Sequence, residues 1–282
     1  MKKKIIAIIV AIVLIIPVSS GWYEFLLDNF FDAELASSTQ LKFRKISDTE
    51  VEVVGYDSYL HGSITIPEKI RIGLDIYKVT SIGASAFYRS ISLTSIKIPE
   101  GVTRIGSYAF GECISLTSIK IPEGVTSIGH SAFKGCSSLT SIKIPEGLTS
   151  IGYSAFSGCE KLTNINIPEG VTSIGVEFFS GCSSLASIKI PEGVTSIKSS
   201  AFLGCSRLTS ITIPESLTSI GIYAFWGCSS LTSIKIPEGV TSIGEEAFWG
   251  CYNLEIVIDN SENNVKVEES AFKGCKSVKW LK

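Results

Sequence analysis

The chain contains a 23-residue repeat that continues without a gap from Leu93 to Asn253. One unit, Leu116 to Ser138, reads LTSIKIPEGVTSIGHSAFKGCSS. A fixed period of this length is typical of a solenoid, whose units stack on their neighbours and share one continuous core. The 282 residues could otherwise hold one or two globular domains, but the repeat predicts one elongated domain.

Each unit can be divided into two short strands joined by turns. In LTSIKI, we expect a β-strand that buries the leucine and both isoleucines, and proline ends it because proline cannot donate to a sheet. IPEG fits a type I turn with proline second and glycine fourth. VTSI predicts a second strand, and the next glycine allows a corner. AFxGC predicts a compact helical turn that directs alanine, phenylalanine and cysteine inward.

The amino-terminal segment, residues 1–21, has the pattern of an export signal. Three lysines precede an apolar run from Ile5 to Ile16, and small residues follow Pro17, as in a signal peptide. The run is shorter than the roughly 20 residues that span a bilayer. Trp22 and Tyr23 follow closely, so an uncleaved anchor is the alternative. We expect a secreted or cell-surface protein that contacts membrane only through this segment, with residues 22–40 as a spacer.

Residues 41–62 predict an amino-terminal β cap. LKFRKI and VEVVGY alternate in polarity around SDTE, which indicates a hairpin. A solenoid needs such a cap because its first coil would otherwise expose core and a strand edge. The coils then occupy residues 63–282. The first carries nine extra residues, which we expect as a loop around Lys69 to Tyr77.

The pattern LxxIxIPxxVTxIGxxAFxxCxx resembles the BspA-like, treponemal-type leucine-rich repeat, over about Ser63 to Trp280. The asparagine ladder of the commoner leucine-rich repeat is absent. The resemblance implies a β-rich solenoid, a right-handed arc of 23-residue coils with parallel strands. It also implies a surface protein concerned with adhesion or with host and matrix contact. The family shares no catalytic residue, so only this class of function is implied.

Composition argues against most chemistries. The net charge of −2 gives no basic face for nucleic acid. His61 and His130 are the only histidines, which leaves little for metal or triad sites. There is no P-loop, dinucleotide fingerprint or HExxH motif. We therefore predict no enzyme, no cofactor, no metal site and no nucleic-acid partner.

Eight cysteines in an exported protein would usually suggest disulfides. Equivalent residues of adjacent coils lie about 4.8 Å apart, within the Cα range of a disulfide. Pairing neighbours would nevertheless treat alternate coils differently although their sequences match, and a metal ladder lacks histidines and neighbouring acids. We therefore expect eight reduced thiols that act as small buried side chains.

A row of lysines forms the first candidate binding surface. It comprises Lys97, Lys120, Lys143, Lys189 and Lys235, interrupted by Asn166 and Thr212, with a parallel row of glutamates from Glu100 to Glu238. One interpretation is a solvated face whose glutamates compensate the lysines. The other is a site for an anionic glycan or acidic surface.

An aromatic cluster forms the second candidate. Trp226 and Trp249 occupy the position after the repeated phenylalanine in consecutive coils, and Tyr223 and Tyr252 lie close in sequence. The cluster predicts either local packing or a patch for a partner or for self-association. We expect an exported or cell-surface protein that binds protein or glycan partners. The alternative is a structural, self-associating envelope protein without a dedicated ligand.

Overall fold

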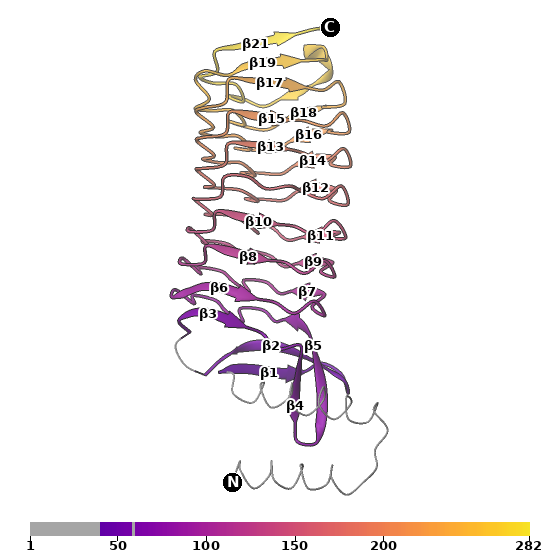
Figure 1. Ribbon diagram of the computed structural model, residues 1–282. Coiled ribbons are helices and arrows are strands. Elements are labelled where there is room, and N and C mark those ends of the chain that lie inside the picture. The colour runs from indigo at the N-terminus through magenta and orange to yellow at the C-terminus, as the bar shows by residue number, and fades with distance from the viewer. Residues whose placement is uncertain (1–39, 58–59) are drawn as a thin grey trace, which may run out of the picture.

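The structure is a computed structural model, and it describes residues 40–57 and 60–282. The predicted signal or anchor, residues 1–21, and the spacer up to residue 39 lie outside the described residues. The coils stack into one elongated column, with the β cap at one end and β21 at the other (Figure 1). Among the described residues, no helix is both long and apolar enough to cross a bilayer.

Two rows of short parallel strands run along the column. The first row contains β3 (Gly62–Thr65), β6 (Leu93–Lys97), β8 (Ser118–Lys120), β10 (Ser141–Lys143), β13 (Ser187–Lys189), β15 (Ser210–Thr212), β17 (Ser233–Ile236), β19 (Glu255–Ile258) and β21 (Ser277–Trp280). The second contains β7 (Arg104–Ile105), β9 (Ser127–Ile128), β11 (Ser150–Ile151), β12 (Ser173–Ile174), β14 (Ser196–Ile197), β16 (Ser219–Ile220), β18 (Ser242–Ile243) and β20 (Lys266–Val267). These rows confirm both predicted strands of the repeat.

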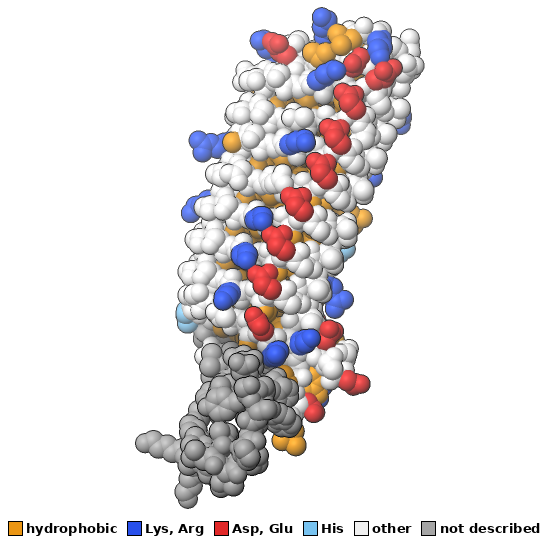
Figure 2. Space-filling view, turned by 45° about the vertical axis from the view of Figure 1, so that its right-hand side comes forward, with side chains coloured by type: hydrophobic (Ala, Val, Ile, Leu, Met, Phe, Trp, Pro, Cys, Tyr) orange, Lys and Arg blue, Asp and Glu red, His pale blue; other side chains and the backbone are white. Residues whose placement is uncertain are grey.

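The pairing between successive coils is in register with the repeat. Ile142 on β10 is the partner of Ile119 on β8, and Lys143 is the partner of Lys120. Because of this register, any residue type that recurs in the sequence becomes a row on the surface or in the core. Figure 2 shows the result as parallel blue and red rows of basic and acidic side chains along the column.

The predicted hairpin cap is confirmed, and a second hairpin replaces the expected loop. Strands β1 (Leu41–Lys45) and β2 (Glu50–Tyr56) pair antiparallel, and β2 pairs in parallel with β5 (Asp75–Ile82) of the first coil. The expected loop around Lys69 to Tyr77 is instead β4 (Lys69–Ile72), antiparallel to β5. Gly73, with φ +68°, supplies the left-handed residue that a two-residue hairpin turn requires.

A continuous stack of phenylalanine rings forms the centre of the core. From Phe87 to Phe248, the ring centroids of neighbouring coils lie 5.1 to 5.7 Å apart. All of these rings are fully buried, together with the repeated leucine and alanine. Stacked aromatic pairs contribute about 0.5–1.5 kcal/mol beyond the area that they bury, so the stack links each coil energetically to the next.

The structure corrects the predicted position of the proline turn. The amide of Val102 donates to the carbonyl of Pro99 at 3.1 Å, so proline is the first residue of the turn and Gly101 is the third. No residue at this third position has positive φ, which explains why Ser216 can replace the glycine. The amide of Leu217 closes that turn on Pro214 at the same 3.1 Å.

The glycine after VTSI has no positive φ, so a corner does not require it, but in most coils close approach of the preceding coil leaves no room for a side chain there. A Cβ added to Gly106 would lie 2.6 Å from the backbone nitrogen of Ala84, in the preceding coil. Lys198, which replaces this glycine in one coil, makes the equivalent hydrogen bond, from its amide to the carbonyl of Ile174 at 2.9 Å. That coil therefore turns in the same way as the others.

The AFxGC segment is not helical, contrary to the sequence prediction. Every second amide in this segment closes a short turn within its own coil; the amide of Gly111, for example, donates to the carbonyl of Tyr108 at 3.0 Å. The amides between them donate to the next coil, as the amide of Phe110 donates to the carbonyl of Ala132 at 2.8 Å. Tyr108 and Glu112 have φ of +55° and +58°, and these left-handed residues prevent a helix. In the described residues, only the 3-10 helix η1 (Glu262–Asn264) is helical.

The cysteines connect the same segment to the preceding coil. All eight are free, and each thiol donates to the carbonyl of the phenylalanine in the preceding coil at 3.1 to 3.5 Å. In the first coil Ser90 replaces cysteine, and its hydroxyl donates to that of Tyr56 in the cap at 3.1 Å. The expected burial is present at seven of the eight side chains, Cys275 being partly exposed, and the thiols have the added role of hydrogen-bond donors.

Both strand rows are interrupted near the middle of the column. Strands β11 and β12 belong to different sheets, and Phe178 stands where the neighbouring coils have alanine. Its ring is buried and meets Phe179 edge-on at 4.8 Å. A Cβ on Gly175 would contact the Tyr153 ring at 3.1 Å but no backbone below 3 Å. The coils are therefore further apart here, because the larger ring needs space.

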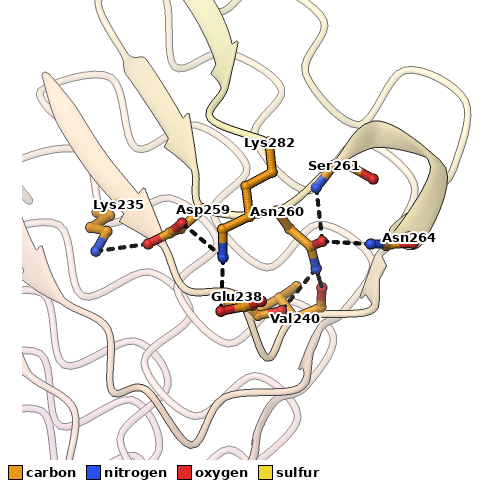
Figure 3. Close-up of polar contacts among 8 residues, drawn as sticks. All are labelled: Lys235, Glu238, Val240, Asp259, Asn260, Ser261, Asn264 and Lys282. Atoms are coloured by element: carbon orange, nitrogen blue, oxygen red, sulfur yellow. Dashed lines mark hydrogen bonds and ion pairs between the residues drawn. The ribbon is translucent and has the colours of Figure 1, made fainter.

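An asparagine replaces the proline turn in the last full coil. Asn260 is only 6% exposed, and its amide nitrogen donates to the carbonyl of Glu238 at 2.8 Å, while its oxygen accepts from the amide of Ser261 at 2.8 Å (Figure 3). Lys282 bridges Glu238 and Asp259, at 2.8 and 3.5 Å. The irregular coil thus satisfies its polar groups through side chains.

The left-handed position held by Glu112 generates a stability prediction. A non-glycine residue there costs about 1–2 kcal/mol, while glycine costs about 0.5–1 kcal/mol in backbone entropy. We expect Glu112→Gly to raise the free energy of unfolding by about 0.5–1 kcal/mol, measured by urea denaturation. As a matched control, Gly135→Ala should destabilise, since Gly135 has φ +72°. A lower stability of Glu112→Gly would contradict this account.

The buried thiols generate a prediction about pH. Burial raises the pKa of Cys113 and of Cys205 to about 12, whereas an unfolded thiol titrates near about 8.5. The unfolded chain therefore loses protons first, and stability should fall from about pH 8.5 towards pH 12, by up to about 1.4 kcal/mol per pH unit for each such thiol. Urea denaturation at pH 7.5, 9 and 10 measures this, and a flat profile would contradict it.

A thiol titration without reductant tests the same cysteines directly. At pH 7.5 the folded chain should react slowly, with the partly exposed Cys275 first, and all eight thiols should react in denaturant. Four or fewer reactive thiols in denaturant would instead show disulfides.

Candidate recognition surfaces

The lysine row lies on the first row of strands and is exposed to solvent. Lys120 reaches back to Glu100 of the preceding coil at 2.9 Å, and Lys143 reaches Glu123 at 2.7 Å. Lys189 makes the equivalent contact with Glu169 at 3.6 Å. Three of the five lysines in the row therefore pair with the glutamate row, whereas Lys235 pairs with Asp259 at 3.3 Å. Because both partners are exposed, solvent screens each pair and its contribution to stability is small.

The ion pairs also reduce the positive electrostatic potential of this surface. The hydrogen bond and charge of Glu123 raise the pKa of Lys143, so the lysine stays charged but is paired with an opposite charge. Lys97 makes no ion pair with any described residue. Thr212 replaces a lysine and Asn166 hydrogen-bonds Glu146 at 3.4 Å. The row is therefore an array of nearly neutral pairs, not a continuous cationic strip.

Three of the aromatic residues singled out in the sequence form one surface, which we call the aromatic ridge: Trp226, Trp249 and Tyr252. Tyr223 is exposed in the turn that carries Trp226. The two indole rings are stacked, with centroids 5.0 Å apart and planes 11° from parallel. Tyr252 meets Trp249 edge-on at 6.5 Å. Both tryptophans are half-buried, whereas Tyr223 is 36% and Tyr252 is 60% exposed.

Backbone hydrogen bonds between coils hold the ridge in place. The amide of Trp226 donates to the carbonyl of Tyr223 at 3.1 Å, which places both residues in one turn. The amide of Gly227 donates to the carbonyl of Trp249 in the next coil at 2.8 Å. This inter-coil bond aligns the two tryptophans, so the rigid column presents them without the entropy cost of ordering a loop.

The two candidate surfaces lie on different parts of the molecule. The lysine row lies at the ends of the first-row strands, with Lys97, Lys120 and Lys143 on β6, β8 and β10. The ridge lies in the turns that precede β17 and β19. The structure therefore brings together the aromatic residues but not the lysines and the ridge. Within the described part of the chain, no group of three or more histidines, cysteines, aspartates or glutamates could hold a metal ion.

The structure also reveals exposed apolar residues that the sequence analysis did not single out. Tyr88 and Tyr108, in the first coils, meet edge-on at 5.9 Å, and Ile91 and Ile114 are exposed nearby in sequence. Their signal in the sequence is position, because they occupy the variable places of the repeat after glycine, phenylalanine and cysteine. Tyr88 and Tyr108 are inconspicuous in the sequence, and only the register between coils shows that their rings meet.

The chain is similar to a known family of repeat proteins. Residues 62–176 and 149–279 match the family described as BspA type Leucine rich repeat region, in six copies. Among curated proteins there is no match.

Three solved structures are similar to the chain. A leucine-rich repeat protein from Bacteroides ovatus is 29% identical over 86% of this chain and 75% of its own, with a TM-score of 0.66. The Treponema pallidum leucine-rich repeat protein is 28% identical over 76% and 88%, with a TM-score of 0.60. A leucine-rich repeat protein from Eubacterium ventriosum is 25% identical over 67% and 64%, with a TM-score of 0.51. With the family match extending over most of the chain, the protein belongs to the BspA type leucine-rich repeat family, whose fold is a repeat scaffold.

Proposed function

We propose that this chain is a recognition scaffold, exported or held at the cell surface, that binds a protein partner through the aromatic ridge. The observation that carries the proposal is the stacked pair of Trp226 and Trp249, flanked by the exposed Tyr252. Tryptophan and tyrosine dominate the energetic centres of protein interfaces. Their half-buried state gives a pre-organised surface whose remaining apolar area is still available to a partner.

The ring geometry favours a protein over a glycan at this ridge. Sugars bind to tryptophan mainly by stacking on an open ring face, but each indole here covers one face of the other, at 5.0 Å. Tyr252 lies edge-on beside Trp249 and crowds the ridge further. Ring edges and the Tyr252 hydroxyl remain exposed, and they suit the mixed apolar and polar contacts of a protein interface.

Location and lack of catalysis are part of the same proposal. The basic and apolar pattern of residues 1–21 supports export, and a binding scaffold needs access to external partners. The small number of histidines and the absence of nucleotide motifs support a non-catalytic role. Lys97, Lys120 and Lys143 form a second candidate surface for anionic glycans, although their paired glutamates weaken its attraction.

A binding screen followed by substitution tests the ridge. The full chain is immobilised and screened by surface plasmon resonance against a panel of extracellular-matrix proteins and glycans. For a protein hit, we expect Trp226→Ala and Trp249→Ala each to weaken binding at least about tenfold, because buried aromatic residues at interfaces contribute on the order of 2 kcal/mol. Tyr252→Ala should have a smaller effect because its ring is the most exposed of the ridge.

The control is Tyr153→Ala, which removes an aromatic side chain from a turn in another part of the column. Tyr153 is 57% exposed, close to the 60% of Tyr252. It should leave binding unchanged, and thermal unfolding should confirm that every variant is folded. Wild-type affinity in both tryptophan variants would reject the ridge as the binding site. An absence of hits, together with ordered self-assembly in sedimentation velocity, would favour the structural, self-associating alternative.

A further inference from the structure

A groove of about 800 Å³ lies between the cap and the first coils, away from the aromatic ridge. The β4–β5 hairpin lines one part of it, and strands β7 and β9 of the second row line another. Its volume is in the range of small-molecule sites. Its charged lining consists of Glu50, Glu68, Lys69, Lys78, Glu100 and Arg104.

The cations of this groove have no partner among the described residues. Lys69 and Lys78 are direct partners across the β4–β5 hairpin, where like charges are destabilising. Glu50 on β2 is the partner of Lys78 on its other side, but the two form no salt bridge. Neither lysine, nor Arg104, forms a salt bridge in this part of the chain, whereas Glu100 is already paired with Lys120 at 2.9 Å. The groove therefore presents three unpaired cations beside two unpaired carboxylates, those of Glu50 and Glu68.

A buried hydroxyl in the same groove also lacks a partner. Ser81 is 3% exposed, lines the groove, and has the one buried side-chain oxygen or nitrogen in the described residues without a hydrogen bond. Along the sheet its neighbours are Glu52 and Arg104, and Arg44 already occupies the Glu52 carboxylate. An unsatisfied buried hydroxyl is costly and needs an explanation.

The remaining polar surface consists of hydroxyls from successive coils. Thr103 donates its hydroxyl proton to the carbonyl of Thr80 at 3.3 Å, and Thr126 donates to that of Thr103 at 3.4 Å. Their protons are used within the protein, so their oxygens are left to accept hydrogen bonds from a ligand. Ser81 and Ser127 add two further hydroxyls to the lining.

We propose that this groove binds an acidic sugar, a saccharide unit that carries one carboxylate and several hydroxyls. Arg104 pairs with the sugar carboxylate, in the two-pronged geometry that guanidinium groups favour. Ser81, whose hydroxyl is buried, rotates its side chain to donate to the same group. Glu50 and Glu68 accept hydrogen bonds from the sugar hydroxyls. A neutral sugar would leave the cations unpaired, and a densely sulfated glycan would be repelled by the two glutamates.

Calorimetric titration of the full chain tests the proposal with three probes of similar length. These are a hyaluronan tetrasaccharide, which carries glucuronate carboxylates, a neutral tetrasaccharide of N-acetylglucosamine, and a sulfated heparin tetrasaccharide. We expect saturable binding of hyaluronan tetrasaccharide only. Glucuronic acid and N-acetylneuraminic acid, tested as competitors, then distinguish a uronate from a sialate source.

Substitutions locate the site. Arg104→Gln should weaken hyaluronan tetrasaccharide binding at least about tenfold, and Ser81→Ala several-fold. Ser81→Ala should leave the Tm unchanged or raise it, because it removes an unsatisfied group. The matched control Arg207→Gln, at an exposed arginine in a distant coil, should bind like wild type. Trp226→Ala should also retain sugar binding, so failure of the ridge proposal would be seen separately.

Several outcomes would overturn the proposal. No saturable binding of any acidic probe would remove the site, and equal binding of the neutral tetrasaccharide would remove the role of the carboxylate. Wild-type affinity in Arg104→Gln would place the ligand elsewhere. A lower Tm in Ser81→Ala, with unchanged binding, would show that the hydroxyl is structural.

Discussion

The fold depends on stacking of coils in exact register. A single unit cannot bury its phenylalanine, leucine and isoleucines, and its exposed amides have no partner within the unit, so both needs are met by the neighbouring coils. The same register produces the phenylalanine stack, with centroids 5.1 to 5.7 Å apart, and the thiol bonds from cysteine to the phenylalanine carbonyls. Close approach then requires glycine, as at Gly106, where an added Cβ would meet backbone at 2.6 Å.

This constraint separates the repeat into positions that build the column and positions that are free to vary. The conserved frame within the chain is buried or bonded to the next coil, while the variable places lie in the turns and in the hairpin insertion. Both proposed binding sites use the variable places. The aromatic ridge arises where two consecutive coils place tryptophan in the same turn, and the groove arises where the first coil carries the β4–β5 hairpin. The scaffold supplies rigidity to both.

Much of the fold could be predicted because periodicity and register are properties of the sequence itself. The two strand rows follow from the spacing of the repeat, and the hairpin cap follows from the alternation of polarity around SDTE. The prediction of a helical turn at AFxGC was wrong, because the residue type of a position such as Glu112 does not reveal its left-handed conformation, with φ +58°. The insertion after Glu68 was expected as a loop, but its pairing with β5 depends on contacts that a short, mixed pattern does not specify.

The sequence by itself determined the family and the architecture, because a 23-residue period leaves only a stacked solenoid able to bury its apolar side chains. It also placed Trp226 and Trp249 at equivalent positions of adjacent coils. Only the tertiary structure decided that their rings stack, that Lys120 and Lys143 are neutralised by the preceding coil, and that Ser81 is buried beside unpaired cations. These features depend on distances between coils and on side-chain orientation, which residue spacing along one chain does not contain.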